Sequence, residues 1–209
     1  MKKNNLLRQI FAAIFLLLPL AAGLLLWERL PERMAIHWNI YGEPDGWAGR
    51  AVAVLLLPLV LLLLQGLSQL LSRREEGRTA AALRLWIIPV LSLVCGAVTY
   101  CPVFFPEMKP DGLMPLLLGL LFAILGNFLP KLPRSRTLGI KIKWTLESDE
   151  NWYATHRFTG WLWSAGGMLM IFCALLPKKL LPAALLPLVL AMILLPVLYS
   201  WRYSRRKAQ

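Results

Sequence analysis

The chain has 209 residues, of which 58% are hydrophobic and 16% are charged, and 23 Lys and Arg residues against 11 Asp and Glu residues leave a formal net charge of +12. Soluble globular proteins contain about 45–50% apolar and about 25% charged residues. The composition therefore excludes an ordinary soluble domain and predicts a surface that faces lipid. The basic excess must then be explained by where the charges lie along the chain.

Uncharged runs long enough to cross a membrane occur six times. About 20 helical residues cross a hydrocarbon core about 30 Å thick, so an apolar run of 18 or more residues is a candidate span. The runs without Lys, Arg, Asp or Glu are residues 10–27, 51–72, 85–106, 112–130, 158–177 and 180–201. The predicted fold class is an all-α integral membrane protein, a bundle of six transmembrane helices.

The first run has a second interpretation. Lys2, Lys3 and Arg8 precede it as basic residues precede the apolar part of a secretory signal peptide, and small residues follow at 21–22. Residues 24–27 continue the apolar run past that point, which favours a retained helix.

The basic residues divide unequally between the two sides of such a bundle. With the amino terminus in the cytoplasm, 17 of the 23 Lys and Arg residues lie inside and 6 lie outside. The positive-inside rule then predicts that both termini are cytoplasmic. This orientation accounts for the basicity, and a nucleic-acid reader would need a basic folded domain or arm. We therefore expect no nucleic-acid partner.

Residue types that carry catalysis or bind metals are scarce. Cys95, Cys101 and Cys173 lie within spans without C-x-x-C spacing, and the predicted orientation separates His37 from His156. No ionisable side chain lies inside any run, so the usual markers of a proton-coupled transporter are missing. We predict no enzyme activity, no metal site and no cofactor.

The long external connection, residues 28–50, is expected to be structured because it is rich in Trp, Gly and Pro. Residues 34–41 alternate as a short strand does, and residues 43–46 fit a turn. Two interpretations remain open. The loop either presents His37, Asn39 and Asp45 to an external ligand or is an interfacial loop anchored by its aromatic side chains.

The long cytoplasmic connection, residues 131–157, is expected to be structured for the same reason. Ser148 followed by two acids predicts a helix start, and Trp152 and His156 then share one helix face at i and i+4. Antiparallel packing of the fourth and fifth helices would bring Asn127 to the same depth, which predicts one polar cluster with Arg157 beside it. Residues 138–144 alternate and fit a short extended segment. Anchoring of its lysines to anionic lipid is the alternative to a binding site.

Three segments, GNFLPK, LGIKIKWTL and WYATHRFTG, resemble motifs of the SdpI family of bacterial immunity proteins, whose usual pattern is close to GN-x-x-x-K, GIR-x-PWTL and W-x-x-T-H-R. The upstream segment LPERMAIHWNIYGEPDGW resembles the external module that precedes the SdpI domain in longer members. The resemblance implies functional positions on the cytoplasmic side at Gly126, Asn127, Gly139, Ile140, Lys141, Trp144, Thr145, Leu146, Trp152, Thr155, His156 and Arg157. In the external loop it implies His37, Asn39, Gly42, Asp45 and Trp47.

One departure from the family pattern concerns Lys141, which stands where the family has arginine. A bidentate contact would then be replaced by a point charge. The resemblance also divides the chain into residues 1–72, a helix pair with the external module at 28–50, and residues 73–209, a four-helix domain with the motif loop at 131–157.

The function that the resemblance implies is that of a receptor and immunity protein in the bacterial cytoplasmic membrane. Its partners would be a secreted peptide toxin and, as in some members, a cytoplasmic transcriptional repressor held at the membrane, with anionic lipid at the cytoplasmic face. Two alternatives from other classes are a small-molecule or lipid transporter, with Asn127 and His156 lining a polar pocket, and a membrane assembly partner.

Overall fold

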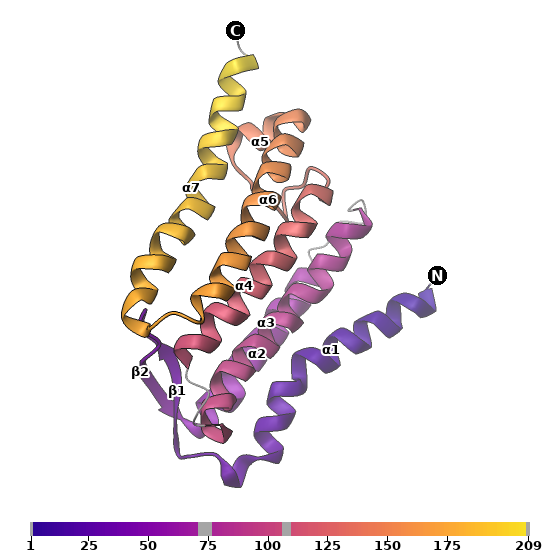
Figure 1. The fold of residues 1–209 in the computed structure, drawn as a ribbon. Helices are drawn as coiled ribbons and strands as arrows, with labels where there is room; N and C mark the ends of the chain where they lie inside the picture. The colour runs from indigo at the N-terminus through magenta and orange to yellow at the C-terminus, as the bar shows by residue number, and fades with distance from the viewer. Residues whose placement is uncertain (1, 71–76, 106–109, 208–209) are drawn as a thin grey trace. The chain divides into compact units, whose positions relative to one another are not determined.

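Long helices make up most of the computed structural model, which describes residues 2–70, 77–105 and 110–207 (Figure 1). The long helices are α1 (Lys2–Leu25), α2 (Arg50–Leu70), α3 (Arg78–Phe104), α4 (Pro110–Phe128), α6 (Asp149–Cys173) and α7 (Leu181–Lys207). The shorter elements are α5 (Lys143–Glu147), the 3-10 turns η1 (Trp27–Arg29), η2 (Leu129–Lys131) and η3 (Lys178–Leu180), and the strands β1 (Arg33–Trp38) and β2 (Pro44–Gly49). The predicted helical class is confirmed, with one small sheet added to it.

Five of these helices are long and apolar enough to cross a membrane. They are Leu6–Leu25, Arg50–Leu70, Arg78–Phe104, Gly112–Lys131 and Lys178–Arg206. The sixth predicted run, 158–177, is not among them. It lies in α6, which ends at Cys173, so any 18 consecutive residues of that helix include the polar residues His156 and Arg157. The count of six spans stays a prediction. Ser72 and Pro106, at which two of the predicted runs end, lie outside the described residues.

The helices form two compact units. The first contains α1, the two strands, α2 and α3 from Ala81 onward, and the second contains α4, α5, α6 and α7. The division of the sequence into 1–72 and 73–209 followed family motifs instead of contacts and stays a prediction.

In the first unit, α1 packs on α3 through small residues and carbonyl contacts. Pro19 interrupts α1, and the helix changes direction part way along its length (Figure 1). A Cβ atom on Gly96 would lie 2.7 Å from the Pro19 ring, so only glycine lets α3 approach there. The Ser92 hydroxyl donates to the Leu16 carbonyl (2.7 Å) and the Tyr100 hydroxyl to the Pro19 carbonyl (3.0 Å). Both side-chain hydroxyls therefore donate to α1 carbonyls near Pro19, where the proline removes a backbone donor from the helix.

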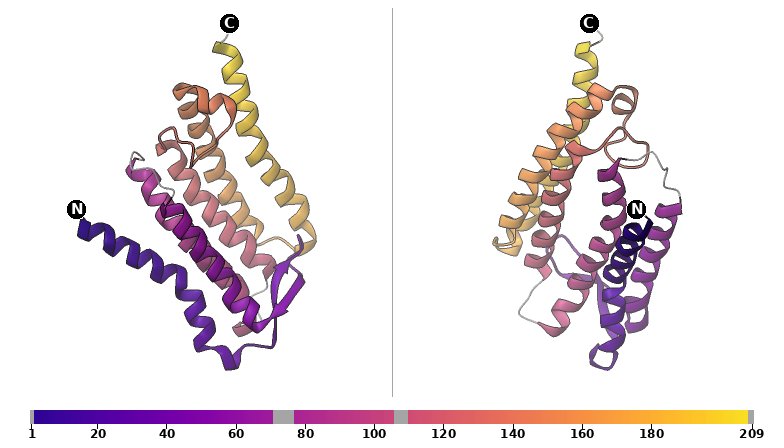
Figure 2. Two further views of the ribbon diagram at one scale, coloured as in Figure 1. Left: turned by 180° about the vertical axis from the view of Figure 1, so that it is seen from behind. Right: turned by 90° about the vertical axis from the view of Figure 1, so that its right-hand side faces the viewer.

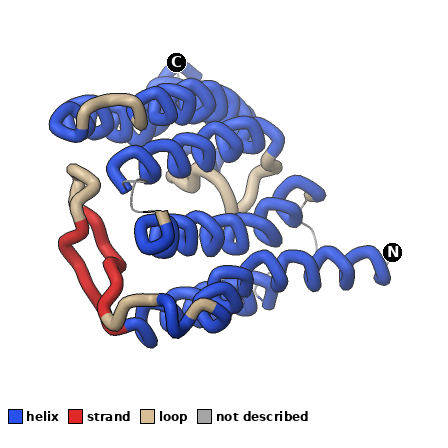
Figure 3. The backbone as a smooth tube through the Cα atoms, turned by 60° about the horizontal axis from the view of Figure 1, so that its bottom comes forward, coloured by secondary structure: helices blue, strands red, loops and turns tan. Residues whose placement is uncertain are grey.

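The two strands form an antiparallel hairpin, drawn red in Figure 3. The predicted strand is confirmed over residues 33–38, but the predicted turn at 43–46 is wrong, since Pro44 already begins β2. The chain reverses at residues 39–42 instead. The Asn39 side chain accepts hydrogen bonds from the backbone N–H groups of Tyr41 and Glu43, and Gly42 supplies a φ of +74°.

The hairpin is attached to the start of α2. The Arg50 backbone N–H donates to the Glu32 carbonyl (2.8 Å), and the Arg50 guanidinium donates to the Trp27 carbonyl (2.8 Å) and lies 5.4 Å from the Trp27 ring centre. Leu30 and Met34 are buried against Val54 of α2. The hairpin is therefore part of the hydrophobic core of the first unit.

In the second unit, α4 and α6 approach through two pairs of glycines. A Cβ atom on Gly119 would lie 2.6 Å from the Gly167 carbonyl oxygen, and one on Gly126 would lie 2.7 Å from the Gly160 carbonyl oxygen. Each helix thus presents glycines seven residues apart, which is two helical turns. Close backbone approach through small residues is the usual packing of helices in lipid, where apolar side chains gain nothing by leaving their surroundings.

Helix α7 lies along α6, as both views of Figure 2 show. The Trp163 indole donates to the Met192 carbonyl (3.0 Å), and the rings of Phe158 and Tyr199 stack with centres 4.6 Å apart. Gly166 leaves room for the Met192 side chain. These contacts fix the register of α7 on the face of α6 that does not pack on α4.

We expect Gly167→Ala to lower the stability of the detergent-solubilised protein by about 1–3 kcal/mol, because the added methyl meets backbone atoms of Gly119 and Ala123 that cannot move aside. Thermal unfolding followed by tryptophan fluorescence measures the effect. Gly66→Ala in α2 is the matched control: nothing lies within 4 Å of its Cβ position, and the change should be neutral or stabilising by about 0.5–1 kcal/mol. Equal melting temperatures for the two variants would contradict the glycine interface.

The predicted orientation is tested by labelling single cysteines in intact cells, in a background in which Cys95, Cys101 and Cys173 are replaced by alanine. Tyr41→Cys, at the exposed hairpin turn, should react with a membrane-impermeant maleimide, and Ser135→Cys should react only after the cells are opened. Tyr41 is preferred to Gly42 because the φ of Gly42 disfavours a side chain. The opposite labelling pattern would invert the assignment of both loops.

Candidate functional site

Residues 149–157 of the predicted motif loop are the first turns of α6, and the remaining residues, 131–148, which are called the motif loop from here on, fold back onto those turns, where Trp152 and His156 hold them. Both side chains are fully buried, and their rings stack with centres 4.0 Å apart and an angle of 22° between the planes. The Trp152 indole donates to the Leu132 carbonyl (2.9 Å). The predicted shared face at i and i+4 is confirmed, and so is the helix start, where the Ser148 hydroxyl accepts from the Asn151 N–H (3.2 Å).

The His156 ring is held in its neutral form by two hydrogen bonds of opposite direction. Its Nδ1–H donates to the Trp152 carbonyl (2.8 Å), and its Nε2 accepts from the Ile140 backbone N–H (3.0 Å). A protonated ring would have no lone pair for the Ile140 donor. Burial also lowers the pKa of His156 below its ordinary value, although the bond to the Trp152 carbonyl acts in the opposite direction.

Gly139 lets the loop reach these rings. Its φ of +111° is in the region that favours glycine, and a Cβ atom there would lie 2.5 Å from the His156 Nε2 and 2.8 Å from the Trp152 ring. The conformation places the next residue, Ile140, so that its N–H points at the imidazole. The family glycine therefore has a local physical reason.

Thr145 closes the other end of the loop. It is fully buried in α5, its hydroxyl donates to the Ile140 carbonyl (2.6 Å), and its oxygen accepts from the Ile142 N–H (3.2 Å). Trp144 beside it is half-buried. The predicted extended segment at 138–144 is a loop of bends that runs into α5 at Lys143, since Thr145 turns the chain there.

Lys141 is exposed and directed back to its own loop, where its ammonium donates to the Thr137 carbonyl (3.3 Å). The Arg134 guanidinium pairs with the Asp149 carboxylate (2.8 Å) and donates to the Leu146 carbonyl (3.1 Å). The loop thus holds its backbone carbonyls with its own cations. Arg136 and Lys143 are exposed as well, and they give its outer face a basic character.

Thr155 belongs to a buried polar network between α6 and α7 that sequence reasoning missed. The Asn151 amide donates to the Ser200 carbonyl (3.0 Å), and the Asn151 oxygen accepts from the hydroxyls of Ser200 (2.9 Å) and Thr155 (2.8 Å). The signal in the sequence was present: Asn151 and Thr155 stand four residues apart and so share one helix face, next to the face of Trp152 and His156, and Ser200 is a hydroxyl in an apolar run.

Asn127 lies in a different place from the buried pair. It is exposed and, with Gly126, lines a groove that Arg157 also lines, and neither Trp152 nor His156 contributes to that lining. Among the described residues, the hydrogen-bond partners of His156 are Ile140 and Trp152. The structure therefore brings most of the predicted motif residues together around Trp152 and His156 and places Asn127 with Arg157.

In the hairpin, His37 Nδ1 and the Asp45 carboxylate lie 2.6 Å apart, and both side chains are open to solvent. Asn39 and Gly42 form the turn, as described above, and Trp47 is half-exposed. Trp47 lines a groove of about 570 Å³ with Trp38, Met34, Arg29 and Arg33, closed on one side by α3. The described residues contain no group of three His, Cys, Asp or Glu side chains that could hold a metal ion.

Comparison with known proteins identifies both parts of this arrangement. Residues 131–200, which include the motif loop, α6 and most of α7, match the SdpI/YfhL protein family, and residues 14–62 match a domain of unknown function, DUF1648. The chain is 22% identical to the immunity protein SdpI of Bacillus subtilis (strain 168) over 208 residues. This alignment covers 99% of this chain and 98% of the Bacillus protein. These matches support the SdpI family with a preceding DUF1648 module. No solved structure gives a significant match.

The similarity to the immunity protein SdpI and the five apolar helices make this chain a multi-pass protein of the bacterial inner membrane. The DUF1648 match covers the hairpin and parts of both flanking helices, so the module is larger than the loop at 28–50. The SdpI/YfhL match begins at Lys131 and thus excludes Gly126 and Asn127.

The neutral ring of His156 predicts that the protein loses stability on acidification. In the unfolded chain an imidazole takes up a proton near pH 6.5, whereas burial lowers the pKa of the folded His156. Between those values the unfolded state binds more protons, so the free energy of unfolding should fall as the pH falls from about 7.5 to about 5. Thermal melting at several pH values measures this dependence.

His156→Gln should flatten the pH dependence of the melting temperature, because glutamine does not titrate. Gly66→Ala, which keeps both histidines and adds a methyl group in open space, is the control and should keep the wild-type dependence. A His156→Gln variant with the wild-type pH profile would show that another group is responsible.

Proposed function

We propose that this chain is a membrane immunity protein that protects its host cell from a secreted peptide toxin, without catalysing a reaction. The similarity to the Bacillus subtilis immunity protein carries the proposal, because it extends over nearly the whole of both chains and therefore includes the hairpin as well as the motif loop. The two ordered segments of the chain, the hairpin and the motif loop, then correspond to two parts of one activity.

The hairpin groove suits the peptide. It combines an apolar floor, from Met34, Trp38 and Trp47, with the guanidinium groups of Arg29 and Arg33 at its rim. Aromatic and arginine side chains are the commonest anchors of protein and peptide interfaces. An apolar segment of the toxin would lie on the indole rings, and a carboxylate of the toxin would pair with an arginine.

The motif loop suits a cytoplasmic partner, and its buried residues limit which atoms that partner can touch. Trp152, His156 and Thr145 are fully buried, so they shape the loop and do not contact a partner directly. The exposed cations Arg136, Lys141 and Lys143 form the surface that a partner would meet. A repressor held at the membrane would therefore present an acidic surface to this loop.

A toxin challenge tests the proposal. Sensitive bacteria that express the wild-type chain should survive candidate secreted peptides, and Arg33→Gln and Trp47→Ala should lower the protective effect. Loss of a charge-assisted hydrogen bond costs about 1.5–3 kcal/mol, equivalent to about 10–100-fold in affinity. His37→Ala and Asp45→Ala, which break the pair beside the turn, should weaken protection less.

Gly66→Ala, far from the hairpin turn and in open space, is the control for expression and insertion, and it should protect as the wild type does. Wild-type survival in all four hairpin variants, at equal membrane expression, would remove the hairpin from the mechanism. If Asn127→Ala abolished efflux of a small molecule or lipid while toxin survival was unchanged, the transporter alternative would replace the proposal. If no peptide were resisted and the chain co-purified stoichiometrically with another membrane protein, the assembly alternative would replace it.

A further inference from the structure

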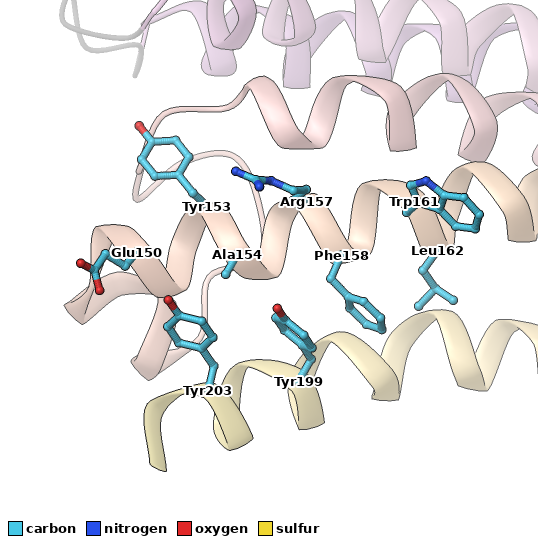
Figure 4. A pocket seen from close by; sticks show the side chains of 9 residues that line it. All are labelled: Glu150, Tyr153, Ala154, Arg157, Phe158, Trp161, Leu162, Tyr199 and Tyr203. Atoms are coloured by element: carbon cyan, nitrogen blue, oxygen red, sulfur yellow. The ribbon is translucent and has the colours of Figure 1, made fainter. Parts of the chain in front are cut away.

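Two grooves flank α6 in the second unit and overlap along the helix at residues 157–161. The first lies between α6 and α7, has a volume of about 750 Å³, and is shown in Figure 4. The second lies towards α4, has a volume of about 440 Å³, and is floored by Gly126 and Gly160. Both volumes are in the range of about 300–1,000 Å³ that small-molecule ligands occupy. The two grooves share Arg157 and Trp161, which stand on the ridge between them.

The first groove changes from polar to apolar along the helix axis. Glu150, Tyr153 and Tyr203 lie at the end near the start of α6, and Phe158, Leu162 and Trp161 lie towards its middle, as Figure 4 shows. Arg157 stands between the two ends. A phospholipid changes in the same order along its length, from a polar headgroup to apolar acyl chains. Tyrosine and tryptophan are the side chains that favour the membrane interface.

Arg157 is exposed, and among the described residues its guanidinium has no hydrogen-bond or ion-pair partner. Beyond it, α6 exposes large apolar side chains: Trp161 is 79% exposed and Phe172 is 60% exposed. Exposed apolar surface of this extent marks a membrane or protein interface, and in a membrane-spanning chain it faces lipid. The exposed cations Arg202, Arg205 and Arg206 at the end of α7 add positive potential on the polar side. The Glu150 carboxylate, two helical turns before Arg157, marks the far polar end of the groove.

We propose that Arg157 binds the phosphate of an anionic diacyl phospholipid, whose two acyl chains occupy the two grooves on either side of Trp161. The guanidinium is the side chain that matches a phosphate bidentately. The tyrosine hydroxyls of the first groove are placed near the glycerol and headgroup. Two grooves that share a cation and then diverge around α6 fit a ligand with one charged group and two apolar tails. This site lies in the second unit and does not depend on the hairpin or on protection from a toxin.

Native mass spectrometry of the purified full-length protein tests the site. The protein is incubated with equal amounts of phosphatidylglycerol and phosphatidylcholine that carry the same acyl chains, and the lipid retained is counted. We expect preferential retention of phosphatidylglycerol, a loss of about tenfold or more in Arg157→Gln, and a smaller loss in Arg157→Lys, which keeps the charge without the planar fork. Lys179→Gln, in η3 between α6 and α7, removes an equal exposed charge outside both grooves and should retain lipid as the wild type does.

The two-groove geometry is tested by filling each groove. Ala154→Trp occupies the first and Ala165→Trp the second, and each should lower retention of diacyl phosphatidylglycerol more than that of the single-chain lyso form. Melting temperatures equal to that of the wild type show that each variant is folded. Equal retention of the two headgroups, wild-type retention by Arg157→Gln, or displacement of the lipid by glycerol phosphate alone would overturn the proposal.

Discussion

The stacked pair of Trp152 and His156 is the contact on which the motif loop depends. Because the Ile140 N–H donates to the imidazole and the imidazole donates to the Trp152 carbonyl, the ring must be neutral, and its orientation is fixed. The indole in turn satisfies the Leu132 carbonyl. One helix face thus pairs two backbone groups of a loop that has little other secondary structure. Buried backbone groups without a partner are costly, so replacing Trp152 would leave the Leu132 carbonyl unpaired, and replacing His156 would leave the Ile140 N–H unpaired.

The glycines determine how closely the helices around this loop can pack. Gly160 and Gly167 on α6 face Gly126 and Gly119 on α4, and the face of α6 towards α7 carries Asn151 and Thr155. In lipid neither face gains from burying apolar side chains, so close backbone approach on one side and hydrogen bonding on the other hold the helices together. The polar side of α6 therefore stabilises the bundle.

The hairpin shows how a correct element can be predicted with an incorrect turn. The alternation of residues 34–41 indicated a strand, which the structure contains, but Pro44–Gly46 has the composition of a turn and forms part of β2. Asn39 favours a turn at residues 39–42, because its side-chain oxygen accepts hydrogen bonds from the backbone N–H groups of Tyr41 and Glu43. A turn at residues 43–46 would leave these two N–H groups without that acceptor. Asp45, released from the turn, becomes the partner of His37. Both turn signals are local, and the pairing of β1 with β2 along the hairpin decides which of them forms the turn.

The sequence by itself determined the apolar helices, the start of α6 at Ser148 and the resemblance to the SdpI family, because hydrophobic run length, capping residues and motif spacing are local properties. It also indicated that Trp152 and His156 share a face, since i and i+4 are neighbours on any helix. Only the tertiary structure decided that Asn127 lines a groove beside Arg157 and away from His156, and that Asn151 bonds to Ser200. Those contacts depend on the rotation of one helix about its axis relative to the next, and that rotation is set by side-chain packing between segments about fifty residues apart, which no local pattern encodes.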